Sequence, residues 1–276
     1  MPFKTQQHAQ DLIDFIDASP SPWHAVATME TRLLAAGFNR LHEVDRWKLN
    51  HGGRYFIIRG ASSIIAFTLG KEPLLTRGLR IVGAHTDSPG LRIKPRPAED
   101  VSGMVRLGVE IYGGPILATF ADRDLSLAGR VNVRSIDGFS THLIRFNEPL
   151  LRLPNLAIHM NREVNEQGLK FNKQTELPLL LGLSEPGIPA DGRFRQLIAE
   201  QLDVDTPDLL TWELNAYDTQ KGCFWGDERS FIADSQLDNL ASCHAALSAL
   251  IAMENPASTA MCAFFDHEEV GSESAA

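Results

Sequence analysis

A short apolar run that ends in a block of charge constrains this chain more than any other segment. The run AMCAFF at residues 260–265 has the length and composition of a buried β-strand. Four ionisable residues follow it directly: Asp266, His267, Glu268 and Glu269. In open α/β sheets, ligands bind outside the carboxyl ends of the strands, so charges at this place favour a functional site over the alternative, a solvated acidic turn. Two adjacent carboxylates also repel each other unless a cation or hydrogen-bond donors hold them.

A second strand of this kind is predicted earlier in the chain. The apolar run at residues 79–84 leads to His85, and Asp87 follows two residues later. On an extended backbone these two side chains point to the same face. Asp87 can therefore accept a hydrogen bond from one ring nitrogen of His85 and fix the tautomer of the ring.

A third polar position, Asp238, stands where a helix is predicted to begin. Apolar residues recur with helical spacing over residues 240–251, and Asp234 or Ser235 is the expected N-cap. Asp238 could act only as a first-turn acid that favours the helix dipole. His85 likewise has an ordinary explanation as a buried, hydrogen-bonded histidine.

Taken together, these positions indicate a metal centre. His85, Asp238 and the pair Glu268 and Glu269 lie where doubly wound sheets bring side chains to one edge. A neutral imidazole with hard carboxylates and no cysteine suits zinc or manganese, or a pair of such ions. His267 is expected to have a structural role or to support the ligands, because its neighbours already supply the acids.

The two ends of the chain share one hydrophobic pattern, and the middle of the chain has a different one. Residues 1–93 and 230–276 combine helical patterns with apolar runs of strand length, which predicts an α/β domain built from two segments. Residues 94–229 show alternating apolar positions and glycines, which favours an antiparallel, half-exposed sheet, with one short helix expected at residues 194–201. The sequence therefore predicts a discontinuous α/β domain with an inserted, mainly antiparallel β domain.

The composition limits the kinds of partner. The chain has 276 residues, 43% of them hydrophobic, which is enough for a sizeable core. With 26 basic against 35 acidic residues and a formal net charge of -9, nucleic acid and anionic membrane surfaces are not expected as partners. Three widely spaced cysteines, an N-terminus without an apolar signal core and the lack of a bilayer-length apolar run favour a cytoplasmic protein.

Several segments also carry a family resemblance. The blocks HTDSPGLRIKP at residues 85–95, DSQLDNL at 234–240 and FDHEEVGSES at 265–274 resemble the signature blocks of the aspartyl aminopeptidase family of zinc metallopeptidases. The resemblance continues through residues 19–26, 122–130 and 156–162. It therefore covers essentially the whole chain and implies a zinc-aminopeptidase-type mixed sheet flanked by helices, with an inserted, mainly antiparallel β domain.

The resemblance also implies roles for the predicted site residues. A dinuclear centre with two zinc ions, which manganese or cobalt can replace, would remove an N-terminal residue from peptides, preferably aspartate or glutamate. His85 would bind one metal, Asp238 would bridge both and Glu269 would bind the second. Glu268 would be the general base and Asp87 would orient His85.

The resemblance also has implications for the inserted domain and for the end of the chain. Residues 94–229 would mediate homo-oligomerisation, and His159 would lie near the active site of a neighbouring subunit. Members of the family continue well past the last strand and supply one more aspartate and one more histidine ligand there. We therefore expect a C-terminally truncated chain with the last part of the catalytic domain missing, and poor solubility or poor metal retention for this chain alone.

Two alternative functions remain open from the residues alone. One is another metal-dependent amidohydrolase on the same scaffold, such as a carboxypeptidase or a deacylase. The other is a catalytically silent chain that only oligomerises through residues 94–229.

Overall fold

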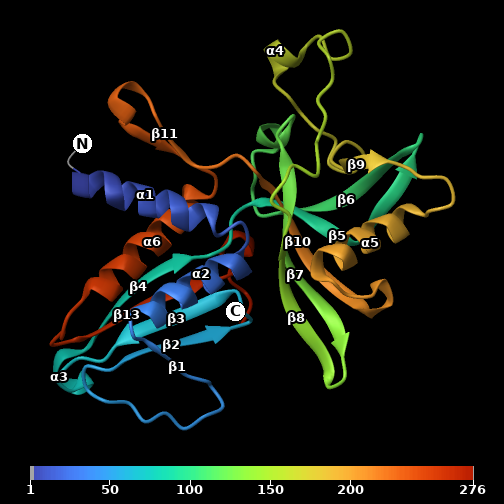
Figure 1. Cartoon of the computed structure of the whole chain (residues 1–276). Coiled ribbons are helices and arrows are strands. Elements are labelled where there is room, and N and C mark those ends of the chain that lie inside the picture. The colour runs from blue at the N-terminus through green and yellow to red at the C-terminus, as the bar shows by residue number, and fades with distance from the viewer. Residues whose placement is uncertain (1–2, 276) are drawn as a thin grey trace. The chain divides into compact units, whose positions relative to one another are not determined.

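The computed structural model describes residues 3–275 and divides into two compact units (Figure 1). Unit 1 comprises Met1–Ser88 and Lys221–Ala276, and unit 2 comprises Pro89–Gln220. The sequence predicts domain boundaries after residues 93 and 229. The junctions between the units lie earlier in the chain, after Ser88 and after Gln220. The predicted fold class is confirmed, because each unit has helices and a sheet and the chain as a whole is a mixed α/β structure.

Two helices at the start of unit 1 are separated by a Ser-Pro-Ser-Pro turn. Helix α1 spans Phe3–Asp17 and helix α2 spans Pro22–Ala35. The hydroxyl of Ser19 donates to the Phe15 carbonyl, at 2.7 Å, and closes the end of α1. Ser21 is the N-cap of α2 and accepts from the backbone N–H of His24. The proline after it needs no hydrogen-bond donor at this position, so the local sequence both stops one helix and starts the next.

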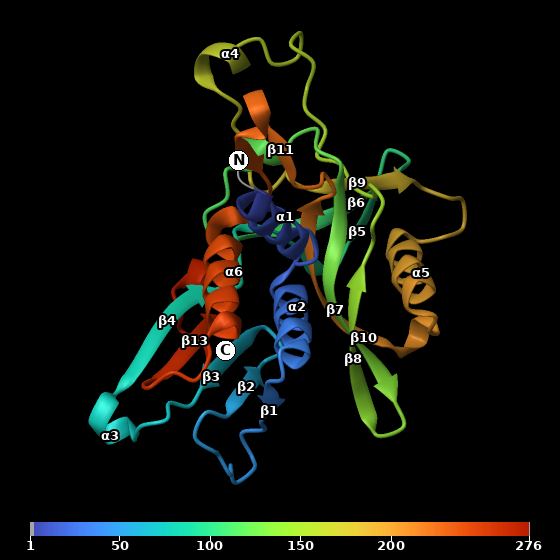
Figure 2. The same cartoon turned by 60° about the vertical axis from the view of Figure 1, so that its left-hand side comes forward.

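The sheet of unit 1 brings together strands from both segments of the unit. Its order is β1-β2-β3-β13-β4. The bounds are Asn39–Arg40 for β1, Arg54–Arg59 for β2, Ser63–Thr68 for β3, Leu79–His85 for β4 and Thr259–Phe265 for β13. Strand β13 is antiparallel to β3 and parallel to β4, with Phe265 opposite His85. The carboxyl ends of β4 and β13 therefore lie side by side, as Figure 2 shows.

Helix α6, Leu237–Ala252, packs with α1 and α2 on this sheet (Figure 2). Their shared core consists of buried apolar side chains from the three helices and the strands, including Phe15, Met29, Leu33, Phe56, Ile64, Leu240, Leu247 and Phe264. The helix starts one or two residues later than the predicted caps would place it. Its N-cap is Gln236, in a left-handed conformation and without a side-chain cap. The expected cap at Asp234 or Ser235 was therefore wrong.

Strand β4 is buried only at its carboxyl end. It is the last strand of the sheet order, and Leu79, Ile81 and Val82 are 42%, 60% and 53% exposed. Ala84 and His85 are buried. The apolar run at residues 79–84 thus forms the predicted strand, but at the edge of the sheet.

Unit 2 is built on a six-stranded antiparallel sheet. Its order is β8-β7-β10-β5-β6-β9. The bounds are Gly90–Val101 for β5, Met104–Tyr112 for β6, Leu125–Ser135 for β7, Gly138–Arg145 for β8, Leu179–Leu183 for β9 and Leu209–Asp218 for β10. Helix α5, Ala190–Leu202, covers the core of this sheet, where Phe194 contacts Trp212 edge to face at 5.4 Å. The short helix expected at residues 194–201 lies within α5.

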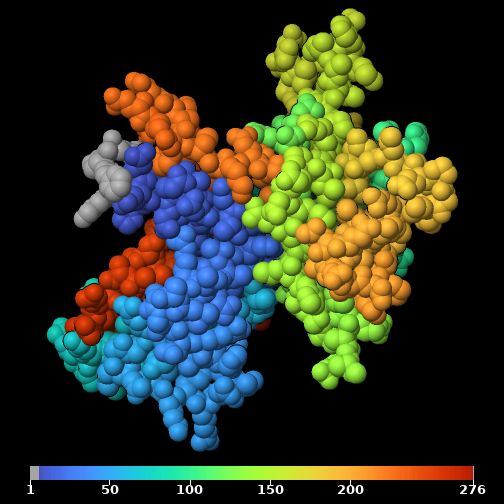
Figure 3. All heavy atoms as spheres, in the orientation of Figure 1, coloured from blue at the N-terminus to red at the C-terminus, as the bar shows by residue number. Residues whose placement is uncertain are grey.

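The remaining elements are short. Unit 1 has helix α3, Leu74–Arg77, and a hairpin of β11, Cys223–Trp225, and β12, Phe231–Ala233. Unit 2 has helix α4, Val164–Gln167, in a loop that forms the yellow-green protrusion at the top of Figure 3. Short 3-10 turns lie at Leu117–Phe120, Thr206–Asp208, Asp227–Arg229 and Glu268–Val270, the last of which is η4. In the part of the chain that the structure describes, no helix has the length and apolar character to cross a membrane.

Candidate metal centre

The pairing of β4 with β13 places the two predicted halves of the site at one edge of the sheet. Beyond the last register pair, the backbone N–H of Thr86 donates to the Phe265 carbonyl at 2.8 Å. The hydroxyl of Thr86 donates to the carbonyl of Ser62 at 2.7 Å. These bonds continue the sheet for one residue past the end of β4, so the loops that follow the two strands start next to each other.

His85 is buried and its two ring nitrogens have different surroundings. Nδ1 lies 3.0 Å from the backbone oxygen of Asp87 and 3.4 Å from its carboxylate Oδ1. Nε2 faces Oδ1 of Asp238 at 3.4 Å and Oε2 of Glu268 at 3.8 Å. Because a carbonyl oxygen only accepts, the Nδ1 contact requires a proton on Nδ1 and leaves the Nε2 lone pair for a metal.

Asp87 is fully buried and holds the turn that carries the two glutamates. Its Oδ1 accepts from the backbone N–H of Glu268 at 3.3 Å, and its Oδ2 accepts from that of Glu269 at 3.2 Å. The predicted contact between Asp87 and His85 is present, but its shorter component uses the backbone oxygen of Asp87. Asp87 therefore connects the loop after β4 to η4, the turn after β13.

Asp238 reaches the site from the start of α6. Its backbone is not helical, with φ -85° and ψ 112°, and its side chain is 87% exposed. The hydroxyl of Ser88 donates to the Asp238 carbonyl at 3.1 Å. This bond joins the first turn of α6 to the loop that follows His85.

The carboxylates of the site repel each other. His85, Glu268 and Glu269 each offer a ligand atom, and these atoms lie within 4.8 Å of one another. The pKa of Glu269 is raised, and burial is the largest cause. The charge of His85 lowers this pKa, whereas the charges of Asp87, Glu268 and Asp238 raise it. A bound cation would relieve this repulsion, as expected for metal ligands.

The residues present fit a zinc ion. Zinc binds imidazole nitrogen and carboxylate oxygen at about 2.0–2.2 Å, so ligand atoms around one ion lie a few ångströms apart, as they do here. Glu268 and Glu269 each have a ligand atom within 4.8 Å of one on His85, and Asp238 contacts Nε2 of His85. The positions therefore allow either glutamate as a ligand, and the assignment of Glu269 as ligand and Glu268 as base stays a prediction.

His267 and Asp266 support the turn rather than the cluster. Asp266 is buried, and its Oδ1 accepts from the His267 backbone N–H at 2.8 Å. The ring Nδ1 of His267 lies 2.6 Å from the Ser274 hydroxyl. These contacts agree with the structural role expected for His267.

His159 lies in unit 2, in an exposed turn between β8 and β9. Asp122, which precedes this loop in sequence, accepts from the backbone N–H of Asn155 at 3.0 Å, and Asp124 pairs with Arg152. The loop around His159 is thus fixed at its base within unit 2. The predicted role of His159 toward another subunit stays a prediction.

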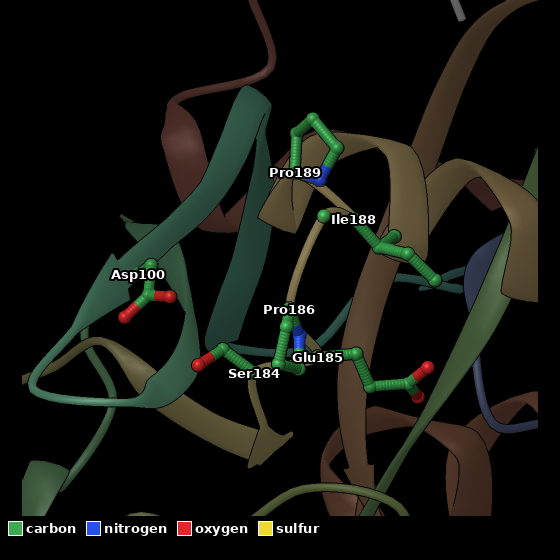
Figure 4. Close-up of a pocket in the computed structure, with 7 residues that line it drawn as sticks. Asp100, Ser184, Glu185, Pro186, Ile188 and Pro189 are labelled. Atoms are coloured by element: carbon green, nitrogen blue, oxygen red, sulfur yellow. The ribbon is translucent and has the colours of Figure 1, made fainter.

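Figure 4 shows a surface pocket in unit 2 that is separate from the predicted site residues. It is lined by Asp100 and by residues 184–189. The side chains of Asp100 and Glu185 point away from each other. None of the predicted ligands lines this pocket, and it has no cluster of chemistry-bearing groups.

Two residues near the centre carried no signal of their own in the sequence. Ser88 contacts the Asp238 backbone, and the Cys243 thiol contacts the His85 backbone. Both contacts join α6 to the end of β4. Only the fold brings these segments together, because the partners are 150 and 158 residues apart.

A histidine and two glutamates at the ends of neighbouring parallel strands, with Asp238 from α6 beside them, form the kind of polar cluster at a sheet edge where α/β proteins bind ligands. Comparison with known proteins gives the family. The family model described as Aminopeptidase I zinc metalloprotease (M18) matches residues 15–276, so this chain belongs to the M18 aminopeptidase family. The predicted zinc metallopeptidase family is thereby confirmed.

Similar bacterial proteins carry the same family name. The probable M18 family aminopeptidase 2 of Ectopseudomonas mendocina is 49% identical over 270 residues, which cover 96% of this chain and 62% of the relative. The protein of the same name from Azotobacter vinelandii is 48% identical over 267 residues, covering 95% of this chain and 61% of the relative. The chain therefore spans less than two thirds of the length of these relatives.

Solved structures share the fold. A chain in the cryo-EM structure of the Ape4 and Nbr1 complex superposes with a TM-score of 0.93 at 36% identity, covering 99% of this chain and 56% of that chain. The mApe1 dodecamer of S. cerevisiae gives a TM-score of 0.80 at 26% identity, covering 96% of this chain and 62% of that chain. These likenesses confirm the predicted zinc-aminopeptidase-type mixed sheet.

Proposed function

We propose that this chain carries the metal-binding part of an M18 zinc aminopeptidase, which releases N-terminal residues from peptides. The observation that carries the proposal is the cluster of His85, Glu268 and Glu269 at the ends of β4 and β13, which Asp238 joins from the start of α6. Membership of the M18 family supports the reaction class.

We assign His85, Asp238 and Glu269 as zinc ligands, with Asp238 shared between two ions. His85 offers Nε2, and Asp87 keeps its ring in that tautomer by occupying Nδ1. Asp238 is exposed and contacts Nε2 of His85 at 3.4 Å from a different element, so its carboxylate has room for a second ion. Bound zinc supplies a Lewis acid that polarises the scissile carbonyl and lowers the pKa of a water molecule.

Glu268 is the general base in this proposal. Its side chain is about half exposed, so water and substrate can reach it, and its backbone is fixed by Asp87. Its carboxylate accepts a proton from the attacking water and then donates it to the leaving amine. The fixed backbone keeps the carboxylate next to the ligands throughout both transfers.

The finer assignments rest on the family resemblance. We propose a preference for N-terminal aspartate or glutamate, a catalytic domain of residues 1–93 and 230–276, and an oligomerisation domain of residues 94–229. The dodecamer of the yeast relative supports a homo-oligomer. His159, in the exposed loop of unit 2, would then serve a neighbouring subunit's active site.

The test is a substrate comparison with the protein kept in excess zinc, which offsets the poor metal retention expected for this chain alone. Peptides that begin with aspartate, glutamate or leucine are incubated beside N-acetylated amino acids and peptides blocked at the N-terminus. We expect release of free aspartate and glutamate, slower release of leucine, and no action on the blocked compounds. Release of acetate, release from the C-terminus, or zinc binding at this cluster with no turnover would contradict the proposed aminopeptidase activity. Parallel loading with manganese or cobalt tests the choice of metal.

A further inference from the structure

A buried thiol contacts the backbone of the predicted ligand His85. Cys243 lies on α6 with no exposed surface, and its Sγ is 3.0 Å from the His85 carbonyl oxygen. A carbonyl oxygen only accepts, so the thiol is the donor. The contact is therefore a hydrogen bond from the core to the last residue of β4.

This bond joins the two elements that carry predicted ligands. His85 ends β4, and Asp238 is the second residue of α6, five residues before Cys243. The Ser88 hydroxyl makes a second link, to the Asp238 carbonyl, at 3.1 Å. The hydrogen bonds of Cys243 and Ser88 thus both connect α6 to the end of β4 and the loop after it, next to the contact between Nε2 of His85 and Asp238.

We propose that Cys243 is a positioning residue for the metal centre: its S–H fixes the His85 peptide so that Nε2 faces Asp238 and Glu268. This inference rests on the proposed zinc site, and it adds a role for a side chain outside the ligand set. Groups behind a ligand orient it, and their loss weakens metal binding by about 10- to 100-fold. A thiol is a weak donor, so we expect the lower end of that range.

The second buried cysteine provides a matched control. Cys262 lies on β13, is 4% exposed, and its Sγ is 3.4 Å from the Ala246 carbonyl. It therefore makes the same kind of contact in the same core, but to a residue outside the metal site. Substitution of either cysteine by valine removes the donor and adds a similar small volume to the same core, so any effect of the added volume is shared by the two variants.

The experiment compares Cys243→Val, Cys243→Ser and Cys262→Val in the 276-residue chain. Zinc dissociation constants are measured by competition with a chromophoric chelator, and thermal midpoints are measured beside them. We expect Cys243→Val to weaken zinc binding about tenfold. Cys243→Ser, which keeps a donor, should restore affinity to within about threefold, and Cys262→Val should leave it unchanged. Equal zinc affinity in Cys243→Val and the unsubstituted chain, or an equal loss in Cys262→Val, would overturn the inference.

A second measurement needs no metal and separates this inference from the proposed function. The nitrogen shifts of the His85 ring in the metal-free protein report its tautomer. We expect Nδ1–H in the unsubstituted chain and a mixture of tautomers in Cys243→Val. An unchanged ring would overturn the role of Cys243. If His85→Ala leaves zinc binding intact, the proposed centre fails instead, and the ring shifts still decide whether Cys243 positions His85.

Discussion

The sheets of the two units differ in where their polar groups lie. In unit 1, β13 is buried along almost its whole length between β3 and β4, and its charged residues follow only after the strand ends. In unit 2, β6 and β10 alternate between buried and more exposed residues along their length. A strand that is covered on both faces can place polar groups only at its ends, whereas a half-exposed strand spreads them along one face.

The difference also shows in how the charges are paired. In unit 2, Arg106 pairs with Glu99 at 2.8 Å, and Arg130 pairs with Glu213, both across neighbouring strands. Such part-exposed pairs contribute about 0–1 kcal/mol each. Among the described residues, the ion pairs of Asp238 and Glu268 in unit 1 involve only His85. The concentrated, unneutralised acids of unit 1 therefore indicate a cation site, and the paired charges of unit 2 indicate a solvated face.

The largest effect should come from removing the proposed base. Glu268→Gln should lower kcat by about 10²- to 10⁴-fold, because the amide cannot accept the proton of water. Zinc binding should persist, since the proposed ligands remain. Kinetics with an aspartyl peptide and a chelator titration check both parts, and Glu213→Gln in unit 2 is the control. Activity near that of the unsubstituted enzyme would remove Glu268 as the base.

The next effect compares the two cores directly. Phe264 on β13 and Phe194 on α5 are both fully buried. Each change to alanine should lower the free energy of unfolding by about 3–5 kcal/mol. Only Phe264→Ala should also weaken zinc binding, because its strand leads to the glutamates. Denaturant unfolding measures the loss of stability, and zinc titration at denaturant concentrations below the unfolding transition measures the zinc affinity. Equal zinc affinities in the two variants would contradict this difference between the two cores.

A smaller loss is expected at Asp87. Asp87→Asn retains one acceptor oxygen where the carboxylate has two, so one of the N–H groups of Glu268 and Glu269 loses its partner. Zinc affinity should fall by about 10- to 100-fold. Asp124→Asn, at an exposed ion pair in unit 2, is the matched control. An unchanged dissociation constant for Asp87→Asn would leave Asp87 as a turn residue only.

The last comparison concerns a carboxyl of unit 1 outside the metal cluster. Burial, and then the charge of Asp17, raise the pKa of Asp234 to about 7. The folded state therefore binds this proton more tightly than the unfolded state, where the value is 3.8. Its contribution to stability is full below that value and is lost as the pH rises through about 7.

Asp234→Asn should accordingly be more stable than the unsubstituted chain at pH 8, with the difference disappearing near pH 4. Thermal midpoints at closely spaced pH values measure this, and Asp137→Asn in an exposed turn of unit 2 gives the effect of removing a surface charge. Parallel pH curves for Asp234→Asn and the unsubstituted chain would show that Asp234 does not titrate as described.

Much of the site could be predicted because its elements are local in sequence. The apolar run at residues 260–265 and the acids after it form β13 and η4, and the run at residues 79–84 forms β4. The spacing of the apolar residues and the abrupt change to charged residues are enough to locate such strand ends. The alternating pattern of the middle region likewise corresponds to the antiparallel sheet of unit 2.

The rest depends on contacts between distant segments. The position of β4 at the sheet edge, with Ile81 and Val82 exposed, is a property of strand order, which a single apolar run does not encode. The bonds from Asp87 to the backbone of Glu268 and Glu269 cross 181 and 182 residues. The N-cap was misplaced because Gln236 adopts a left-handed conformation that its residue type does not predict.

The most direct test of the metal centre is an anomalous difference map at the zinc edge from crystals of the zinc-loaded chain. We predict two peaks that share Asp238: one about 2.0–2.2 Å from Nε2 of His85 and one at about the same distance from a carboxylate oxygen of Glu269, while Glu268 stays outside bonding distance. A strongest zinc peak away from His85, or a peak bound by Glu268 in place of Glu269, would contradict this prediction.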